Sequence, residues 1–210
     1  MWETLKWSFK MAATDVEVFS KHIDFEWELY EAFHMDPIPE PVWLIQAGAR
    51  AQTEEYRDFY HGKRWPEIVG YRSYRGMDTP SAWLPYIPLS IATYYLPGHM
   101  LFESHQMPPS AKSGRPGNLT EMFFLPPSSD PKLLNEIEEE MYYDEDMVTQ
   151  RPYRMALYSA LTINQRHCVA SYLNLYISYN PDWPSGKALE LYNANLELWR
   201  RAEELSSPGE

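Results

Sequence analysis

The sequence predicts a mainly α-helical protein that folds as a single domain over residues 1–210. Apolar residues recur at steps of three and four, which is the spacing of one face of a helix. A capping residue followed by proline, typical of a helix start, occurs at Thr79-Pro80 and Asp130-Pro131. Other prolines interrupt the pattern. We therefore expect a helical bundle of about seven to nine helices with proline-broken segments and one long loop.

The N-terminal region is expected to form a helix over residues 3–34, either continuous or broken near Ser20. Three residues at four-residue steps make its inward face: Phe25, Leu29 and Phe33. Three carboxylates make a second, solvated face: Asp24, Glu28 and Glu31. The proline-rich run over residues 36–41 excludes helix and predicts an extended connector.

The middle of the chain predicts shorter elements. A second helix is expected over residues 42–60, with Gly62 near its end, followed by a short element over 65–69. Three prolines then divide the chain up to Gln106 into short helical pieces: Pro85, Pro88 and Pro97. Residues 107–118 hold prolines and glycines among small polar residues, which predicts a mobile surface loop.

Two further helices are expected between residues 130 and 161. The first begins at Asp130-Pro131, and its apolar stripe is Leu134, Ile137 and Met141. The second covers residues 151–161. The apolar run Phe123-Phe124-Leu125 is too short to distinguish a strand from a helix.

The last two helices carry clear signals. Thr162 and Gln165 have the form of a capping box, in which each side chain satisfies a backbone amide of the other. The helix that follows has a buried stripe of Cys168, Val169, Tyr172, Leu173 and Tyr176. After a proline-containing turn, the final helix begins at Ser185 and ends near Leu205, with Leu189, Tyr192, Leu196 and Trp199 facing inward. Residues 206–210 are expected to fray.

The composition argues against several classes of protein. The single cysteine, Cys168, cannot form an intramolecular disulfide, and its place on an apolar stripe predicts a buried thiol. No apolar run reaches the length of a membrane span, and no signal-peptide pattern opens the chain. A formal net charge of −12 disfavours nucleic acid and anionic membranes as partners. We expect a cytoplasmic protein with no cofactor.

The most distinctive stretch runs from Glu136 to Asp146, where seven of eleven residues are acidic and none is basic. In a helix, like charges three or four residues apart cost about 0.2–0.5 kcal/mol per pair. We interpret the stretch as a surface for a basic protein, with two tyrosines as contact anchors. The expected partner-binding residues are Glu136, Glu138, Glu139, Glu140, Tyr142, Tyr143, Asp144, Glu145 and Asp146.

Other interpretations remain open. The acidic stretch can be a solvated face that Arg151 and Arg154 neutralise, or a divalent-cation site, although it lacks EF-hand spacing. The alternative functional classes are an enzyme with a novel helical pocket and a structural oligomer subunit built on the aromatic residues. The enzyme would be metal-assisted or carboxylate-dependent, and its candidate residues are His99, Glu103 and His105, or Glu28 and Glu31 beside aromatic rings. No metalloprotease, nucleophile-elbow, phosphate-binding or dinucleotide motif is present.

Four stretches resemble an uncharacterised bacterial family of small helical proteins, known as a domain of unknown function. They are Glu31-Ala32-Phe33 before the proline-rich connector, Phe59-Tyr60-His61-Gly62-Lys63-Arg64-Trp65, Tyr95-Leu96-Pro97, and Leu161-Thr162-x-x-Gln165. The resemblance spans about residues 31–173 and implies an all-helical domain with no known activity. The chain departs from the family pattern in its longer first helix, the loop over 107–118 and the acidic stretch.

The overall character also resembles bacterial immunity proteins, which block a cognate toxin. Many such toxins act on nucleic acid and are basic, so complementary charge would steer the two proteins together. We therefore expect a non-enzymatic binding protein, an immunity protein that neutralises a cognate, basic toxin by occluding it.

Overall fold

The computed structural model describes residues 13–38, 59–69, 84, 87–106, 118–123, 151–179 and 186–200. Within these ranges the protein is mainly α-helical and has no strand, as the sequence predicts. The elements are α1 (Ala13–Ala32), the 3-10 helix η2 (Trp65–Ile68), α3 (Leu89–Gln106), α4 (Asn118–Met122), α7 (Arg151–Ala160), α8 (Ile163–Tyr179) and α9 (Gly186–Arg200). None of these helices is long and apolar enough to cross a lipid bilayer.

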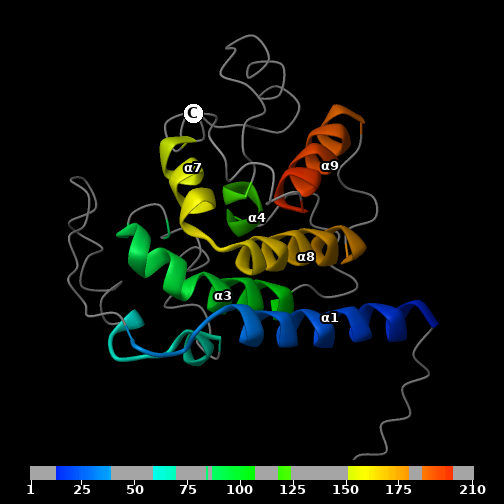
Figure 1. Ribbon diagram of the computed structural model, residues 1–210. Coiled ribbons are helices and arrows are strands. Elements are labelled where there is room, and N and C mark those ends of the chain that lie inside the picture. Colours follow the sequence, from blue (N-terminus) through cyan, green and yellow to red (C-terminus); the bar gives the residue numbers. More distant parts are fainter. Residues whose placement is uncertain are drawn as a thin grey trace, which may run out of the picture.

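Helix α8 lies at the centre of the described part of the molecule (Figure 1). It packs against α1 on one side and against α9 on the other. Helix α3 contacts α1, α7 and α8, and η2 packs on α3. Among the described helices, α1 packs mainly against α8 and α3, and it lies at the lower edge of the view in Figure 1.

Large aromatic side chains fill the core between these helices. The most deeply buried are Trp65, Trp199, Tyr60, Tyr95, Tyr172, Tyr192, Phe25 and Phe123. Several of their polar atoms find partners inside the protein: the Tyr95 hydroxyl shares its one proton between the carbonyl oxygens of Tyr60 (2.9 Å) and Lys63 (2.8 Å). The indole Nε1 of Trp199 donates to the carbonyl of Phe123 at 2.9 Å. Hydrogen bonding of this kind lets aromatic residues with a polar end serve as core residues.

Helix α8 confirms its sequence signals. The Thr162 amide donates to Gln165 Oε1 at 2.9 Å, and the Gln165 amide donates to Thr162 Oγ1 at 3.4 Å, which completes the capping box. The expected stripe is buried: Cys168, Val169, Tyr172, Leu173 and Tyr176. Because α8 buries residues on several sides, it can serve as the central helix.

The expectation that Pro97 separates two short helical pieces is wrong, because α3 runs through it without a break. An interior proline removes a backbone hydrogen bond and costs about 3 kcal/mol relative to alanine. Tertiary packing offsets this cost. Gly98, the next residue, faces η2 so closely that a Cβ there would lie 2.3 Å from the carbonyl oxygen of Trp65. The proline rule describes the helix alone and does not include this contact.

Two other expectations have different outcomes. Gly62 has a φ of 67°, the left-handed conformation that glycine adopts after a helix, in agreement with its predicted place. Leu189 was expected to face inward, and this is wrong because it is 39% exposed. It lies in the first turn of α9, whereas contact with α8 is made further along, where the Tyr192 hydroxyl donates to the carbonyl of Leu173.

Helix α1 is continuous through Ser20, which answers the question of a break there. Asn118, expected at the end of the long loop, is the first residue of α4. Several predicted elements lie outside the described residues: the body of the helix over 42–60, the helix that begins at Asp130, the loop over 107–117 and the tail over 206–210.

Candidate binding surface on helix α1

The expected partner-binding stretch from Glu136 to Asp146 lies outside the described residues. Arg154, one of the two arginines expected to neutralise it, is buried in α7. The described part of the protein contains another acidic surface with exposed aromatic residues, and this surface lies on α1.

The inner face of α1 holds the helix firmly on the core. Phe25, Leu29 and Phe33 are buried, as their four-residue spacing predicts. Two side chains of α8 also bond to the α1 backbone: Cys168 Sγ lies 3.4 Å from the carbonyl oxygen of Glu28, and Gln165 Nε2 donates to Ala32 at 3.3 Å. A helix fixed in this way presents its other faces in a defined orientation.

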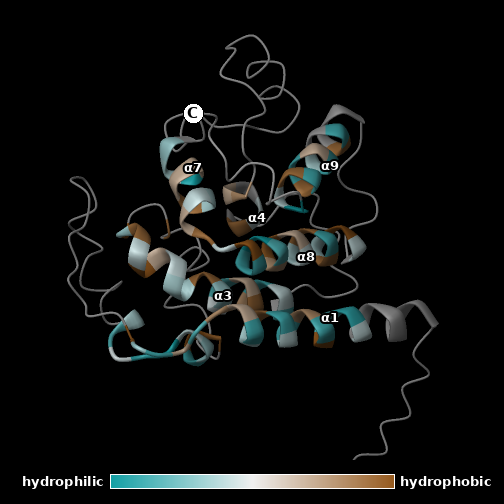
Figure 2. Cartoon of the chain, in the orientation of Figure 1, coloured by the Kyte–Doolittle hydropathy of each residue, from teal (hydrophilic) through white to brown (hydrophobic). Residues whose placement is uncertain are grey.

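The outer face of α1 carries apolar side chains that the core does not cover. Trp27 is 66% exposed, Ile23 is 43% exposed and Tyr30 is 38% exposed. They recur at steps of four and three, so they form a second stripe along the helix. Helix α1 is largely hydrophilic in Figure 2, with hydrophobic segments between the hydrophilic ones. A hollow of about 440 Å³ lies against the same three residues and Glu26.

At one end of the apolar stripe, Tyr30 packs against a buried residue of η2. The ring of Tyr30 lies 4.9 Å from the ring of buried Trp65 in η2, centroid to centroid. Burial, followed by the negative charge of Glu26, raises the pKa of the Tyr30 hydroxyl. Trp27 is the most exposed of the large apolar side chains in the described residues. An exposed tryptophan on a helix that is held in place by its other face is typical of a protein contact site.

Helix α1 is also strongly acidic. It contains six carboxylates against a single lysine, Lys21, which gives a net charge of −5; the acidic residues are Asp15, Glu17, Asp24, Glu26, Glu28 and Glu31. Two ion pairs of the described residues lie off this helix, at Arg64–Asp36 and Arg200–Glu197. Asp24, Glu28 and Glu31 are exposed, as the sequence predicts. Two of these carboxylates also act on a buried group. Burial raises the pKa of the Cys168 thiol to about 12, and the negative charges of Glu28 and Glu31 contribute to this rise.

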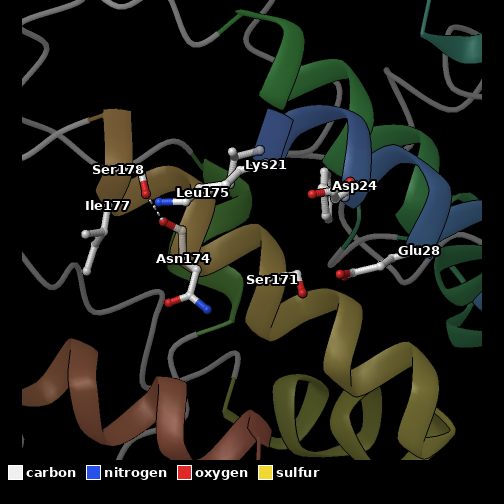
Figure 3. Close-up of a pocket in the computed structure, with 9 residues that line it drawn as sticks. Lys21, Asp24, Glu28, Ser171, Asn174, Leu175, Ile177 and Ser178 are labelled. Carbon is white, nitrogen blue, oxygen red and sulfur yellow. Dashed lines mark hydrogen bonds between the residues drawn. The ribbon is translucent and has the colours of Figure 1, made fainter. Parts of the chain in front are cut away.

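A groove of about 390 Å³ separates α1 from α8 beside this acidic face (Figure 3). Helix α1 contributes Lys21, Asp24 and Glu28 to its wall. Figure 3 shows the Glu28 carboxylate and the Ser171 hydroxyl pointing toward one another from opposite walls. The rest of the lining comes from Phe25 of α1 and from Asn174, Leu175, Ile177 and Ser178 of α8. The groove thus combines carboxylates, the Lys21 ammonium group, neutral hydrogen-bonding groups and an apolar base.

A pair of histidines links α1 to the end of α3. The rings of His22 and His105 lie 5.0 Å apart, centroid to centroid. Burial and the neighbouring His22 lower the pKa of His105, and Glu26 opposes this shift. His22, His105 and Glu26 do not form a metal site, because the described residues contain no group of three His, Cys, Asp or Glu arranged to hold a metal ion.

The residues of the metal-assisted alternative are divided between the interior and the surface. His99 is fully buried, and its Nε2 lies 2.7 Å from the Tyr60 hydroxyl. Burial lowers the pKa of His99 to about 3, so its ring is neutral at physiological pH. Glu103, one turn along, accepts a 2.8 Å hydrogen bond from Tyr172, whereas His105 is exposed. His99 and Glu103 therefore have structural partners, and the cluster does not converge on a cavity among those described.

Comparison with known proteins identifies no relative: no protein-family model, curated protein or solved structure matches the chain. The surface must therefore be interpreted from its own chemistry.

Sequence reasoning missed the apolar stripe on α1. The aromatic rings beside Glu28 and Glu31, which are Trp27 and Tyr30, enter the interpretation of the sequence only as neighbours of these carboxylates, and Ile23 does not enter it. A signal was present, because Ile23, Trp27 and Tyr30 have helical spacing and lie on a different face from Phe25, Leu29 and Phe33. The positions of the other helices decide which of the two apolar stripes is covered. These positions cannot be predicted from the spacing of residues within one helix.

Proposed function

We propose that this protein is a non-enzymatic binding protein that docks a basic protein partner on the outer face of α1. The mode of action that fits best is that of an immunity protein, which neutralises a cognate toxin by occluding it. The observation that carries the proposal is Trp27, a 66% exposed tryptophan in a helix of net charge −5.

The apolar stripe supplies the contact energy in this proposal. Tryptophan and tyrosine give large contact areas at a small cost in side-chain entropy, and they dominate many protein interfaces. Ile23, Trp27 and Tyr30 form a continuous row on a helix whose opposite face is anchored in the core. A partner that covers this row would bury apolar surface without requiring α1 to rearrange.

The surrounding carboxylates favour a basic partner over other occupants. Opposite charge accelerates association and like charge suppresses it, with the effect strongest at low salt. A second copy of the same chain would bring two acidic helices together, and nucleic acid would be repelled. The stretch from Glu136 to Asp146 carries charge of the same sign and is proposed to add to this steering.

The test is capture of a partner from the native host by the immobilised protein and its variants. We expect a basic protein that is released by salt, is lost with Trp27→Ala and is weakened by Glu26→Lys. The matched controls lie on other helices: Met155→Ala removes an exposed apolar side chain from α7, and Glu190→Lys reverses an exposed charge on α9. Both controls should retain the partner.

Two outcomes contradict the proposal. Equal capture by Trp27→Ala and the unaltered protein would remove the outer face of α1 from the interface. A dimer in light scattering that Trp27→Ala converts to a monomer would show that the stripe is a contact between copies, which favours the structural-oligomer alternative.

A further inference from the structure

We propose that the groove between α1 and α8 receives an arginine side chain of the basic partner. This inference rests on the proposed function and specifies the recognition chemistry next to the apolar stripe. The groove lies on the flank of α1 that carries Asp24 and Glu28, one helical turn apart, whereas Ile23 and Trp27 lie on the adjacent outer face. A partner seated on Trp27 can therefore extend a side chain into the groove.

The walls of the groove offer acceptors to a guanidinium group. Asp24 and Glu28 present carboxylates from α1, and Ser171 faces Glu28 from α8 in Figure 3. The Ser178 hydroxyl donates its hydrogen to the carbonyl of Asn174 at 2.9 Å, which leaves its oxygen lone pairs as acceptors. A guanidinium has five N–H donors in a planar fork, so it can bond to acceptors on both walls. An ammonium group has three donors and bonds to fewer of them.

The base of the groove matches the aliphatic part of the same side chain. Phe25 and Leu175 line it, and both are almost fully buried in the core beneath. Arginine places its methylene groups on apolar surface while its charged end stays among polar groups. The volume of about 390 Å³ lies within the range of about 300–1,000 Å³ typical of ligand pockets.

The edge of α8 already binds a guanidinium within the protein. Arg200 of α9 donates from Nη2 to Asn174 Oδ1 at 3.1 Å and from Nη1 to Glu197 at 3.0 Å. The amide oxygen lies on α8, and the carboxylate lies on α9 itself, three residues before Arg200. The groove places a different neutral oxygen of α8, the Ser171 hydroxyl, near the carboxylates of α1.

Lys21 provides a test with the opposite sign. Its side chain lines the same groove, so its positive charge opposes the entry of another cation. Removing the charge with Lys21→Met should therefore tighten binding, whereas Asp24→Asn and Glu28→Gln should weaken it. A merely acidic surface patch without a defined groove would not distinguish these positions from Glu31, which is exposed on α1 but does not line the groove.

The direct experiment titrates the whole protein with N-acetyl-arginine-amide and follows backbone amide chemical shifts by NMR. Capped citrulline, in which a neutral urea replaces the guanidinium, is the matched control ligand, and capped lysine tests the ammonium. We expect arginine to shift the amides of Ser171 and Ser178, lysine to bind more weakly and citrulline to cause no shift. Glu28→Gln should weaken arginine binding about two- to fivefold, as for exposed charge pairs, and Glu31→Gln should leave it unchanged.

Three results would overturn the inference: equal shifts with citrulline, unchanged arginine binding by Glu28→Gln, or weaker binding by Lys21→Met. Binding of the partner to the variants distinguishes a failure of this inference from a failure of the proposed function. A partner that requires Trp27 but binds Glu28→Gln and Asp24→Asn at full strength removes arginine from the groove and leaves the docking surface intact. Capped arginine that binds in the groove while no partner requires Trp27 supports the groove and contradicts the docking surface.

Discussion

Helices α1 and α3 carry the same kinds of polar residue in contrasting surroundings. On α3, His99 and Glu103 are buried, and the structure gives each a hydrogen-bonding partner, Tyr60 and Tyr172. On α1, Glu28 and Glu31 are exposed beside Trp27, and neither forms an ion pair with another described residue. The difference indicates that the polar groups of α3 stabilise the fold, whereas those of α1 remain available to another molecule.

The largest effect is expected where α3 meets η2. Gly98→Ala would place a Cβ 2.3 Å from the Trp65 carbonyl oxygen and 2.7 Å from the Ile68 side chain, so the helices must separate. We expect the free energy of unfolding to fall by at least about 3 kcal/mol, measured by urea denaturation. Gly62→Ala is the control, because a Cβ there meets nothing within 4 Å and only the positive φ opposes it, at about 1–2 kcal/mol. Equal losses from the two variants would show that packing on η2 does not hold α3.

The second-largest effect is a pH dependence of the free energy of unfolding, which arises from the buried residue His99. The pKa of His99 is about 3 in the folded protein and about 6.5 in the unfolded chain, so the unfolded chain takes up the proton first. The stabilising contribution of neutral His99 is complete above pH 6.5 and is lost as the pH falls toward 3, at about 1.4 kcal/mol per unit.

The test compares the unaltered protein with His99→Gln, whose amide can still bond to the Tyr60 hydroxyl. Urea denaturation between pH 7 and pH 4.5 should show a steeper loss of stability for the unaltered protein, because glutamine does not titrate. Parallel pH profiles would mean that His99 is not held neutral by burial.

The third effect concerns α1, the helix whose outer face is proposed to bind the partner. Trp27→Ala should weaken binding of the basic partner by about 2 kcal/mol or more, which is roughly a 30-fold rise in Kd. The free energy of unfolding should change little, since the side chain is mostly exposed. Isothermal titration calorimetry gives the Kd, and Met155→Ala provides the reference. A large loss of stability with unchanged affinity would assign Trp27 to the fold.

The smallest effect distinguishes a functional carboxylate from a structural one. Glu28→Gln removes the like-charge repulsion with Asp24, one turn away, and should stabilise the protein by about 0.2–0.5 kcal/mol. Glu103→Leu removes the acceptor of a buried hydrogen bond from Tyr172 and should destabilise the protein by about 1–3 kcal/mol. Urea denaturation of the two variants side by side measures both signs. Destabilisation by Glu28→Gln would show that α1 needs this charge for folding.

Local spacing predicted the parts of the fold that depend on one helix at a time. The burial of Phe25, Leu29 and Phe33 and the capping box of Thr162 and Gln165 followed from their positions in the sequence. Properties that depend on a distant neighbour did not follow. The continuity of α3 through Pro97 depends on η2, and the exposure of Leu189 depends on where α9 meets α8.

The candidate surface shows the same division. The solvated carboxylates of α1 were predicted, because charge and spacing are local properties. The exposed stripe of Ile23, Trp27 and Tyr30 was not predicted, because apolar residues at helical spacing usually indicate a core face. The groove beside it forms between helices that are about 140 residues apart in sequence, and only the fold brings them together.

The central claim is that a basic partner covers the outer face of α1. Hydrogen exchange of the protein with and without its partner tests this directly, since peptides spanning residues 20–33 report on the stripe and peptides from α7 and α9 report on other surfaces. The proposal predicts slower exchange across residues 20–33 in the complex, with little change over the exposed positions Met155 and Glu190. Protection confined to α7 or α9, with unchanged exchange along α1, would contradict it.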